Sequence, residues 1–116
     1  MKLKGLDELT SQIKRIADRI ESKHIEILKL SAEETILPEA KRLVPVDTGE
    51  LKDSLEIIET PQGIELYAGT DHALPVEFGT AHMAAQPYMR PAIDTQANAM
   101  LERAAELIDR EIEKAV

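Results

Sequence analysis

The tripeptide Asp47-Thr48-Gly49 comes nearer to a known reaction centre than any other group of residues in the sequence. In retroviral-type proteases, one such tripeptide from each of two chains brings two carboxylates together, and the pair shares a proton to give an acid and a base. Those enzymes are almost wholly β, whereas here a helical pattern and Pro45 precede the tripeptide, and Glu50 adds a further negative charge. Asp47 and Glu50 have the spacing of a helix-capping box, so we predict a cap for a short helix over residues 48–54. A dimeric protease using Asp47 is the enzymatic alternative.

The sequence gives little support for a metal site or for a catalytic nucleophile. His72, Glu77 and His82 stand at five-residue intervals, which match neither a helix face nor a zinc pattern. The sequence has no cysteine, which excludes disulfides, thiol catalysis and Cys-type zinc sites. No glycine-rich phosphate loop or nucleophile-elbow serine is present. The sequence therefore predicts no catalytic residue, no metal site and no cofactor.

The charge distribution disfavours nucleic-acid binding. The formal net charge is −8, and the acidic excess lies after residue 44, where phosphate groups would be repelled. Only three aromatic residues are present, Tyr67, Phe78 and Tyr88, too few for a base-stacking platform. No apolar run approaches the ~20 residues of a membrane-spanning helix, so we expect no membrane association.

The elements that must position these residues begin with a long helical pattern over residues 6–44. We expect a kink or break just before Pro38, which cannot donate the helical hydrogen bond, with Ser31 and Glu34 capping a second helix. The early part, residues 6–37, carries a narrow heptad-like apolar line, which predicts either a helix–helix seam with a neighbouring subunit or a helix covering its own sheet.

The remaining pattern predicts a single α+β domain over residues 1–116. Two β-type runs, 55–60 and 64–69, flank a Pro/Gly turn and predict an antiparallel hairpin. An irregular stretch over residues 70–91 follows, with a helical turn at 73–78 ended by Gly79 and an extended piece at 86–90 that joins the sheet edge. A helix starting at Pro91 then packs on the sheet.

Three segments together resemble a family of phage proteins. They are residues 43–54 (LVPVDTGELKDS), 76–80 (VEFGT) and 83–92 (MAAQPYMRPA). In this order and spacing they are similar to the "putative tail-component" family of lambdoid long-tailed bacteriophages. The family-motif residues of the first segment are Pro45, Val46, Asp47, Thr48, Gly49, Leu51 and Ser54.

The resemblance implies a non-enzymatic virion protein at the head–tail junction. Such a protein forms a homo-oligomeric ring between head-closure or adaptor proteins and the tail, is assembled in the bacterial cytoplasm, and meets passing DNA only through non-sticking contact. A helical adaptor unrelated to phage is a second alternative.

The irregular stretch is the predicted subunit interface, because it is rich in apolar, methionine and aromatic residues and contains one arginine. We expect Arg90 to pair with Glu77 or Asp94, or with an acidic neighbour across the ring. The predicted interface residues are Leu74, Val76, Glu77, Phe78, Gly79, Thr80, Met83, Gln86, Pro87, Tyr88, Met89 and Arg90.

Three acidic residues of the hairpin, Glu56, Glu59 and Glu65, are candidates for the lining of a ring lumen. An acidic lumen would repel DNA phosphates at short range and let the duplex slide. The alternative is that these side chains only keep the protein soluble.

Overall fold

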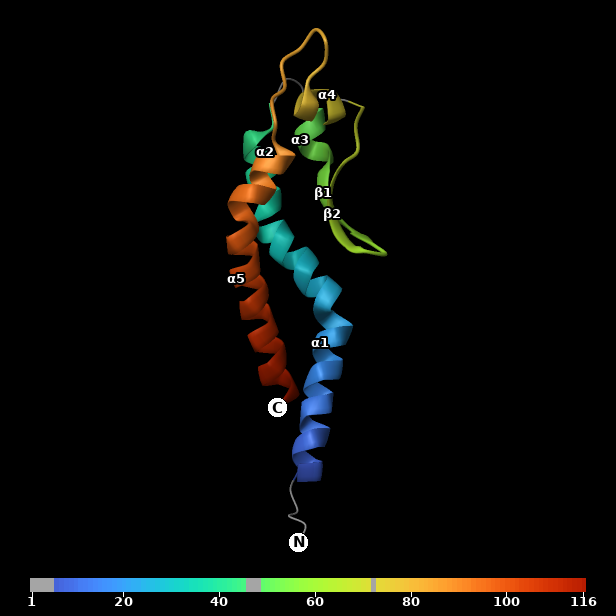
Figure 1. Ribbon diagram of the computed structural model, residues 1–116, viewed down its shortest axis with the longest axis vertical. Coiled ribbons are helices and arrows are strands. Elements are labelled where there is room, and N and C mark those ends of the chain that lie inside the picture. Colours follow the sequence, from blue (N-terminus) through green and yellow to red (C-terminus); the bar gives the residue numbers. More distant parts are fainter. Residues whose placement is uncertain (1–5, 46–48, 72) are drawn as a thin grey trace.

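The structure, a computed structural model, describes residues 6–45, 49–71 and 73–116 of the chain. It is a rod measuring 78 × 23 × 22 Å, with two long helices along the rod and a small sheet beside one end (Figure 1). The α+β class predicted from the sequence is confirmed. Within the described residues, no helix combines the length and the apolar character needed to cross a membrane.

The predicted helix over residues 6–44 is present as two helices, α1 (Leu6–Glu34) and α2 (Ile36–Leu43), which meet at Thr35. The break falls just before Pro38, as predicted, so the proline lies in the first turn of α2, where a missing N–H costs little. The predicted capping role of Ser31 is wrong. Its buried hydroxyl donates to the carbonyl of Ile27, 2.7 Å away inside α1, and Thr35 is the residue that precedes α2.

The short helix α3 (Glu50–Ser54) follows Gly49, whose φ of +80° suits glycine. The short helix predicted over residues 48–54 is therefore present, and it begins at Glu50. Val46, Asp47 and Thr48 lie outside the described residues. The predicted Asp47 cap, and the aspartate of the Asp-Thr-Gly tripeptide, therefore stay untested.

The predicted hairpin is confirmed as strands β1 (Leu55–Thr60) and β2 (Gly63–Ala68). They pair antiparallel, from Leu55 opposite Ala68 to Thr60 opposite Gly63. The helical turn is also confirmed as α4 (Ala73–Phe78), and Gly79 ends it with φ +77° and an N–H that donates to the Pro75 carbonyl.

The last helix, α5 (Met89–Ala115), begins two residues before Pro91. The predicted edge strand at residues 86–90 is wrong, because the described sheet has two strands and Met89 and Arg90 already belong to α5. The N–H of Gln86 donates to the Val76 carbonyl, 2.8 Å away, so this piece of chain is tied to α4 instead of to a strand.

One core cluster holds the wide end of the rod together. Ile36, Ala40 and Val44 come from α2 and its end, Leu51 and Leu55 from α3 and β1, and Tyr88 and Ala92 from the start of α5. The C-terminal helix thus meets the sheet through this shared core, and its remaining length runs antiparallel along α2 and α1 (Figure 1). The ion pairs Arg103–Glu34 and Arg19–Glu111, the latter at 2.8 Å, join α5 to α1 along the rod.

Candidate functional site

The predicted interface segment is organised around the carboxylate of Glu77, in the last turn of α4. Its Oε2 accepts the backbone N–H groups of Tyr88 and Met89 at 2.7 and 3.0 Å, and its Oε1 accepts that of Arg90 at 3.0 Å. The residue is only 6% exposed. Glu77 therefore caps the first turn of α5 from another element of the fold.

The physical reason is the unsatisfied start of α5. The first N–H groups of a helix have no partner inside it, and the aligned peptide dipoles of this 27-residue helix favour a negative charge there. The residue before the helix is Tyr88, which makes no side-chain cap bond. Burial raises the pKa of the Glu77 carboxyl, but the N–H groups of Tyr88, Arg90 and Met89 outweigh burial, and the pKa lies below its usual value.

Further hydrogen bonds tie the loop over residues 80–87, and Tyr88 after it, back to α4. The Tyr88 hydroxyl donates to the Ala73 carbonyl at 3.2 Å, and burial, followed by the nearby charge of Glu77, raises the pKa of that phenol. The N–H of Thr80 donates to the Met83 carbonyl at 2.8 Å. These bonds, with that of Gln86 to Val76, fix both ends of the loop against α4.

Gly79 is required by this loop for two independent reasons. Its φ of +77° lies in the left-handed region, and a Cβ there would stand 2.8 Å from the backbone nitrogen of Ala85 and 2.9 Å from the Met83 carbonyl oxygen. Backbone atoms cannot move aside as a flexible side chain would. The Glu-Phe-Gly part of the sequence motif is thus a structural clamp, with a capping acid and a close-approach glycine.

The clamp leaves apolar side chains in solvent. Leu74 and Phe78 stand one turn apart on α4 and are 69% and 73% exposed. Every residue from 80 to 87 is exposed, and none of them is Asp, Glu, Lys or Arg, although 31% of the whole chain is charged. The loop forms the extreme end of the rod (Figure 1). An ordered, uncharged loop with exposed apolar neighbours is the composition that protein interfaces favour.

The predicted interface residues divide into two groups. Glu77 and Tyr88 are buried inside the chain, with Val76, Gly79 and Met89 half-buried, so these residues shape the segment from within. The exposed members are Leu74, Phe78, Thr80, Met83, Gln86, Pro87 and Arg90. The Arg90 side chain pairs with Asp94, at 3.4 Å on the same helix, while only its backbone N–H reaches Glu77.

The described residues of the first motif segment, residues 43–54, contribute to the core and its surroundings. Leu51 is buried in the core cluster, and the Ser54 hydroxyl donates to the Leu51 carbonyl at 2.7 Å. Pro45 and Gly49 are half-buried at the two ends of the undescribed piece. The described part of the motif thus connects the long helices to the sheet.

The three hairpin acids are exposed but do not share one face. Glu56 lies opposite Tyr67 and Glu65 opposite Ile58, which places both acids on the face of the hairpin that points away from the core. Glu59 alternates with the buried Leu55 and Ile57, so it belongs to the other face, near the turn.

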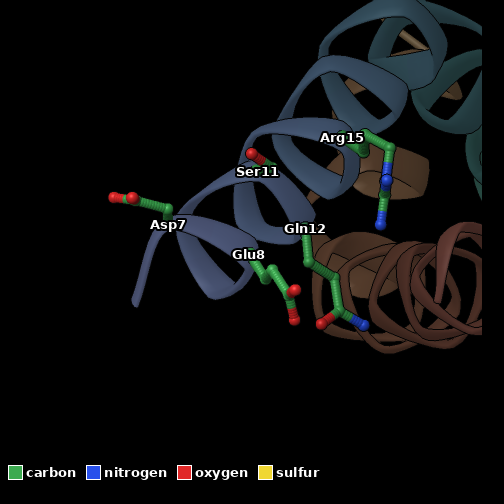
Figure 2. A pocket seen from close by; sticks show the side chains of 5 residues that line it. All are labelled: Asp7, Glu8, Ser11, Gln12 and Arg15. Carbon is green, nitrogen blue, oxygen red and sulfur yellow. The ribbon is translucent and has the colours of Figure 1, made fainter. Parts of the chain in front are cut away.

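A shallow hollow of about 490 Å³ lies at the opposite end of the rod, on the first turns of α1. Figure 2 shows the five side chains that line it, with Asp7 directed away from the rest; they are Asp7, Glu8, Ser11, Gln12 and Arg15. Among the described residues, no group of three or more His, Asp or Glu is placed to hold a metal ion. His72 is outside that part of the chain, and the Glu77 oxygens accept backbone N–H groups.

The capping role of Glu77 was missed by sequence reasoning, although a signal exists. Residues 86–90, Gln-Pro-Tyr-Met-Arg, contain no Ser, Thr, Asp or Asn that could cap the following helix. A long helix without a local cap indicates a capping group elsewhere in the chain, and Glu77 is the acid nearest before its start.

Fold and site together define a small α+β protein in which the buried Glu77 and Tyr88 hold an exposed, uncharged loop over residues 80–87. The chain belongs to the family described as "Bacteriophage HK97-gp10, putative tail-component", whose model matches residues 7–79, well over half of the chain. The match includes the clamp residues Glu77 and Gly79 and ends before the loop. No curated protein and no solved structure matches the chain. Membership supports a structural role in a phage tail, a place in the virion and contacts with other virion proteins.

Proposed function

We propose that this protein is a non-enzymatic ring subunit at the head–tail junction of a phage, between head-closure or adaptor proteins and the tail. The observation that carries the proposal is the exposed apolar surface of α4 and its loop, made of Leu74, Phe78, Met83 and Pro87. In this proposal a neighbouring copy covers that surface, and assembly takes place in the host cytoplasm before incorporation into the virion.

Two features of the chain support an assembly role over catalysis. The buried polar groups of the segment, Glu77 and Tyr88, are used to hold backbone and leave no free acid–base pair. A preorganised loop also loses little conformational entropy when a partner binds, which favours assembly. A retroviral-type protease would need an almost wholly β chain, whereas long helices dominate this one.

The test is replacement of Phe78 by alanine, because this side chain is 73% exposed and makes little contribution to the core of its own chain. We expect native mass spectrometry, on the chain alone and with neighbouring head-closure proteins, to show fewer or weaker rings. Tyr67→Ala is the matched control, since Tyr67 is an exposed aromatic residue on the hairpin. Rings of unchanged mass and stability in the Phe78 variant would refute this interface.

The acidic lumen is a separable part of the proposal. Glu56 and Glu65 share the outer face of the hairpin and are the pair suited to line a passage together, whereas Glu59 lies on the other face. A cryo-EM reconstruction with Glu56 and Glu65 on the outer wall of the ring would refute the lumen, and the acids would then serve solubility.

A further inference from the structure

The exposed apolar surface of α4 needs a counterpart on the neighbouring copy. In a closed ring of more than two identical chains, each contact joins two different patches, one from each copy. Under the proposed function, on which this inference rests, Leu74 and Phe78 belong to one of these patches. The second patch must also be apolar and exposed. It must lie toward the same end of the rod, because neighbours in a ring stand at the same height.

Most of the other exposed apolar side chains among the described residues do not meet these conditions. One group lies at the end of the rod opposite α4 (Figure 1): Leu6, Leu9, Ile13 and Val116. Leu30 of α1 has Glu26 and Glu34 four residues to either side. Tyr67 shares its face of the hairpin with Glu56. A contact at either place would bury charged groups, which is costly unless each is paired.

The remaining candidate is a line of side chains on α5. Ile93, Ala97 and Leu101 follow one another at four-residue spacing, which places them on one side of the helix. We call these three residues the α5 line. All three are exposed, Ile93 by 39% and Leu101 by 65%.

The α5 line and the α4 surface share an unusual composition. The two longest runs of the sequence without Asp, Glu, Lys or Arg are residues 78–89 and 95–101. The first run contains Phe78 and the loop, and the second contains Ala97 and Leu101 on a helix that is charged further along. Depletion of charge is typical of the centre of a protein interface.

The two surfaces are also complementary in shape. Side chains four residues apart form a ridge on a helix, and two helices pack by setting such ridges into each other's grooves. Leu74 and Phe78 form a short ridge on α4. On α5, only the methyl group of Ala97 stands between Ile93 and Leu101, whose positions are about 12 Å apart along the axis. This gap is wide enough to receive the Phe78 ring.

The level of the two surfaces along the rod fits a ring. The Glu77 carboxylate accepts the N–H groups of Tyr88 and Met89, so α4 lies level with the start of α5. Ala97 follows Met89 by about 12 Å along the helix. The rod is 23 × 22 Å across, so rods inclined by roughly 30° bring Phe78 of one copy level with Ala97 of the next. No rise from copy to copy is then needed, and the ring closes.

We propose that the ring contact joins the α4 surface of one copy to the α5 line of the next copy, with the Phe78 ring over Ala97. Each copy then presents α4 to one neighbour and α5 to the other, as a polar ring requires. Neither patch contains a charged side chain, so the contact leaves no unpaired charge buried.

The first test is a matched pair of charge insertions, Ala97→Glu and Ala99→Glu. Both alanines are exposed on α5, so both variants should fold as the wild type does. They stand about 200° apart around the helix, so only Ala97 belongs to the α5 line. In native mass spectrometry, on the chain alone and with head-closure proteins, Ala97→Glu should weaken association at least about tenfold, whereas Ala99→Glu should leave it unchanged. Equal effects of the two changes would overturn the proposal.

Photo-cross-linking tests which surfaces meet and keeps an aromatic side chain in place. The chain with p-benzoylphenylalanine instead of Phe78 is irradiated in the same mixtures, and the joined peptides are identified by mass spectrometry. We expect products between copies at residues 93–101. Products within residues 74–87 would show that two α4 surfaces meet. That result, products at any other part of a second copy, or no product between copies, would contradict the contact.

An exchange of side-chain sizes separates this contact from the proposed function. Phe78→Ala leaves a cavity over Ala97, and Ala97→Phe fills the gap, so each change alone should weaken the ring. The two changes together should associate at least about tenfold more strongly than Phe78→Ala alone, because the aromatic ring is restored from the other side. A ring that Phe78→Ala weakens, without rescue by Ala97→Phe, sinks only the α5 line. A ring that Phe78→Ala leaves unchanged sinks the proposed interface itself.

Discussion

Replacement of Glu77 by glutamine tests the idea that one buried carboxylate holds α4 and the loop after it to the start of α5. The amide is almost the same size, so the packing around the side chain is kept. Its single oxygen can still accept the N–H groups of Tyr88 and Met89. Its NH₂ group, however, would face the N–H of Arg90, and two donors cannot bond to each other.

The expected loss is about 2 kcal/mol in the free energy of unfolding. About 1 kcal/mol comes from the Arg90 N–H left without an acceptor, and about 1 kcal/mol from the lost attraction between a carboxylate and the helix dipole. For a chain of this size, that loss lowers the melting temperature by roughly 6–10 °C.

The assay is equilibrium urea unfolding followed by circular dichroism, with Glu56→Gln as control because Glu56 is exposed on the hairpin. The control should change stability by less than about 0.5 kcal/mol. The folded-state pKa of Glu77 is lowered, so its contribution is present above the unfolded pKa and is lost as the pH falls through the folded pKa. The difference between wild type and Glu77→Gln should therefore be largest near neutral pH and shrink below about pH 4. A variant as stable as the control at neutral pH would refute the cap.

Two further substitutions probe the same clamp. Gly79→Ala should destabilise the chain by about 2 kcal/mol or more, because of the positive φ and the contact with the Ala85 backbone, while Gly69→Ala, at ordinary φ, should cost less than half of that in the same urea assay. Equal effects of the two would show that the loop path differs. Tyr88→Phe removes only the hydroxyl that donates to Ala73 and should cost about 1 kcal/mol, together with faster amide hydrogen exchange in α4. An unchanged exchange pattern there would contradict the tie between the loop and α4.

The elements that the sequence predicted correctly are those specified by neighbouring residues. Pro38 lacks the N–H that a helix interior needs, and α1 indeed ends four residues before it, at Glu34. The hairpin followed from alternation around a Pro/Gly turn, and the end of α4 from Gly79. In each case the cause and its effect lie within one or two turns of chain.

The errors and omissions arose where distant residues compete. Ser31 has the spacing of a helix cap, but the packing of α1 buries it, and its hydroxyl bonds the nearer carbonyl of Ile27. Residues 86–90 were predicted to run extended as an edge strand. The carboxylate of Glu77, eleven residues before Tyr88, instead accepts the N–H groups of Tyr88, Met89 and Arg90, and α5 begins at Met89. Sequence spacing alone does not show which acceptor a free N–H will find.

By itself, the sequence determined the class of most elements, the absence of disulfides and the phage-family resemblance, because composition, periodicity and motif order are properties of the chain alone. Tertiary structure decided which side chains of a given pattern are covered. Tyr88 and Phe78 looked alike as interface residues, but Tyr88 is 0% exposed and Phe78 is 73% exposed. The apolar line at the start of α1 likewise runs from Leu6 to Ile20 in sequence, and only the point where α5 ends leaves its first three members exposed. Burial depends on where other elements stop, and that is set by the packing of the whole chain.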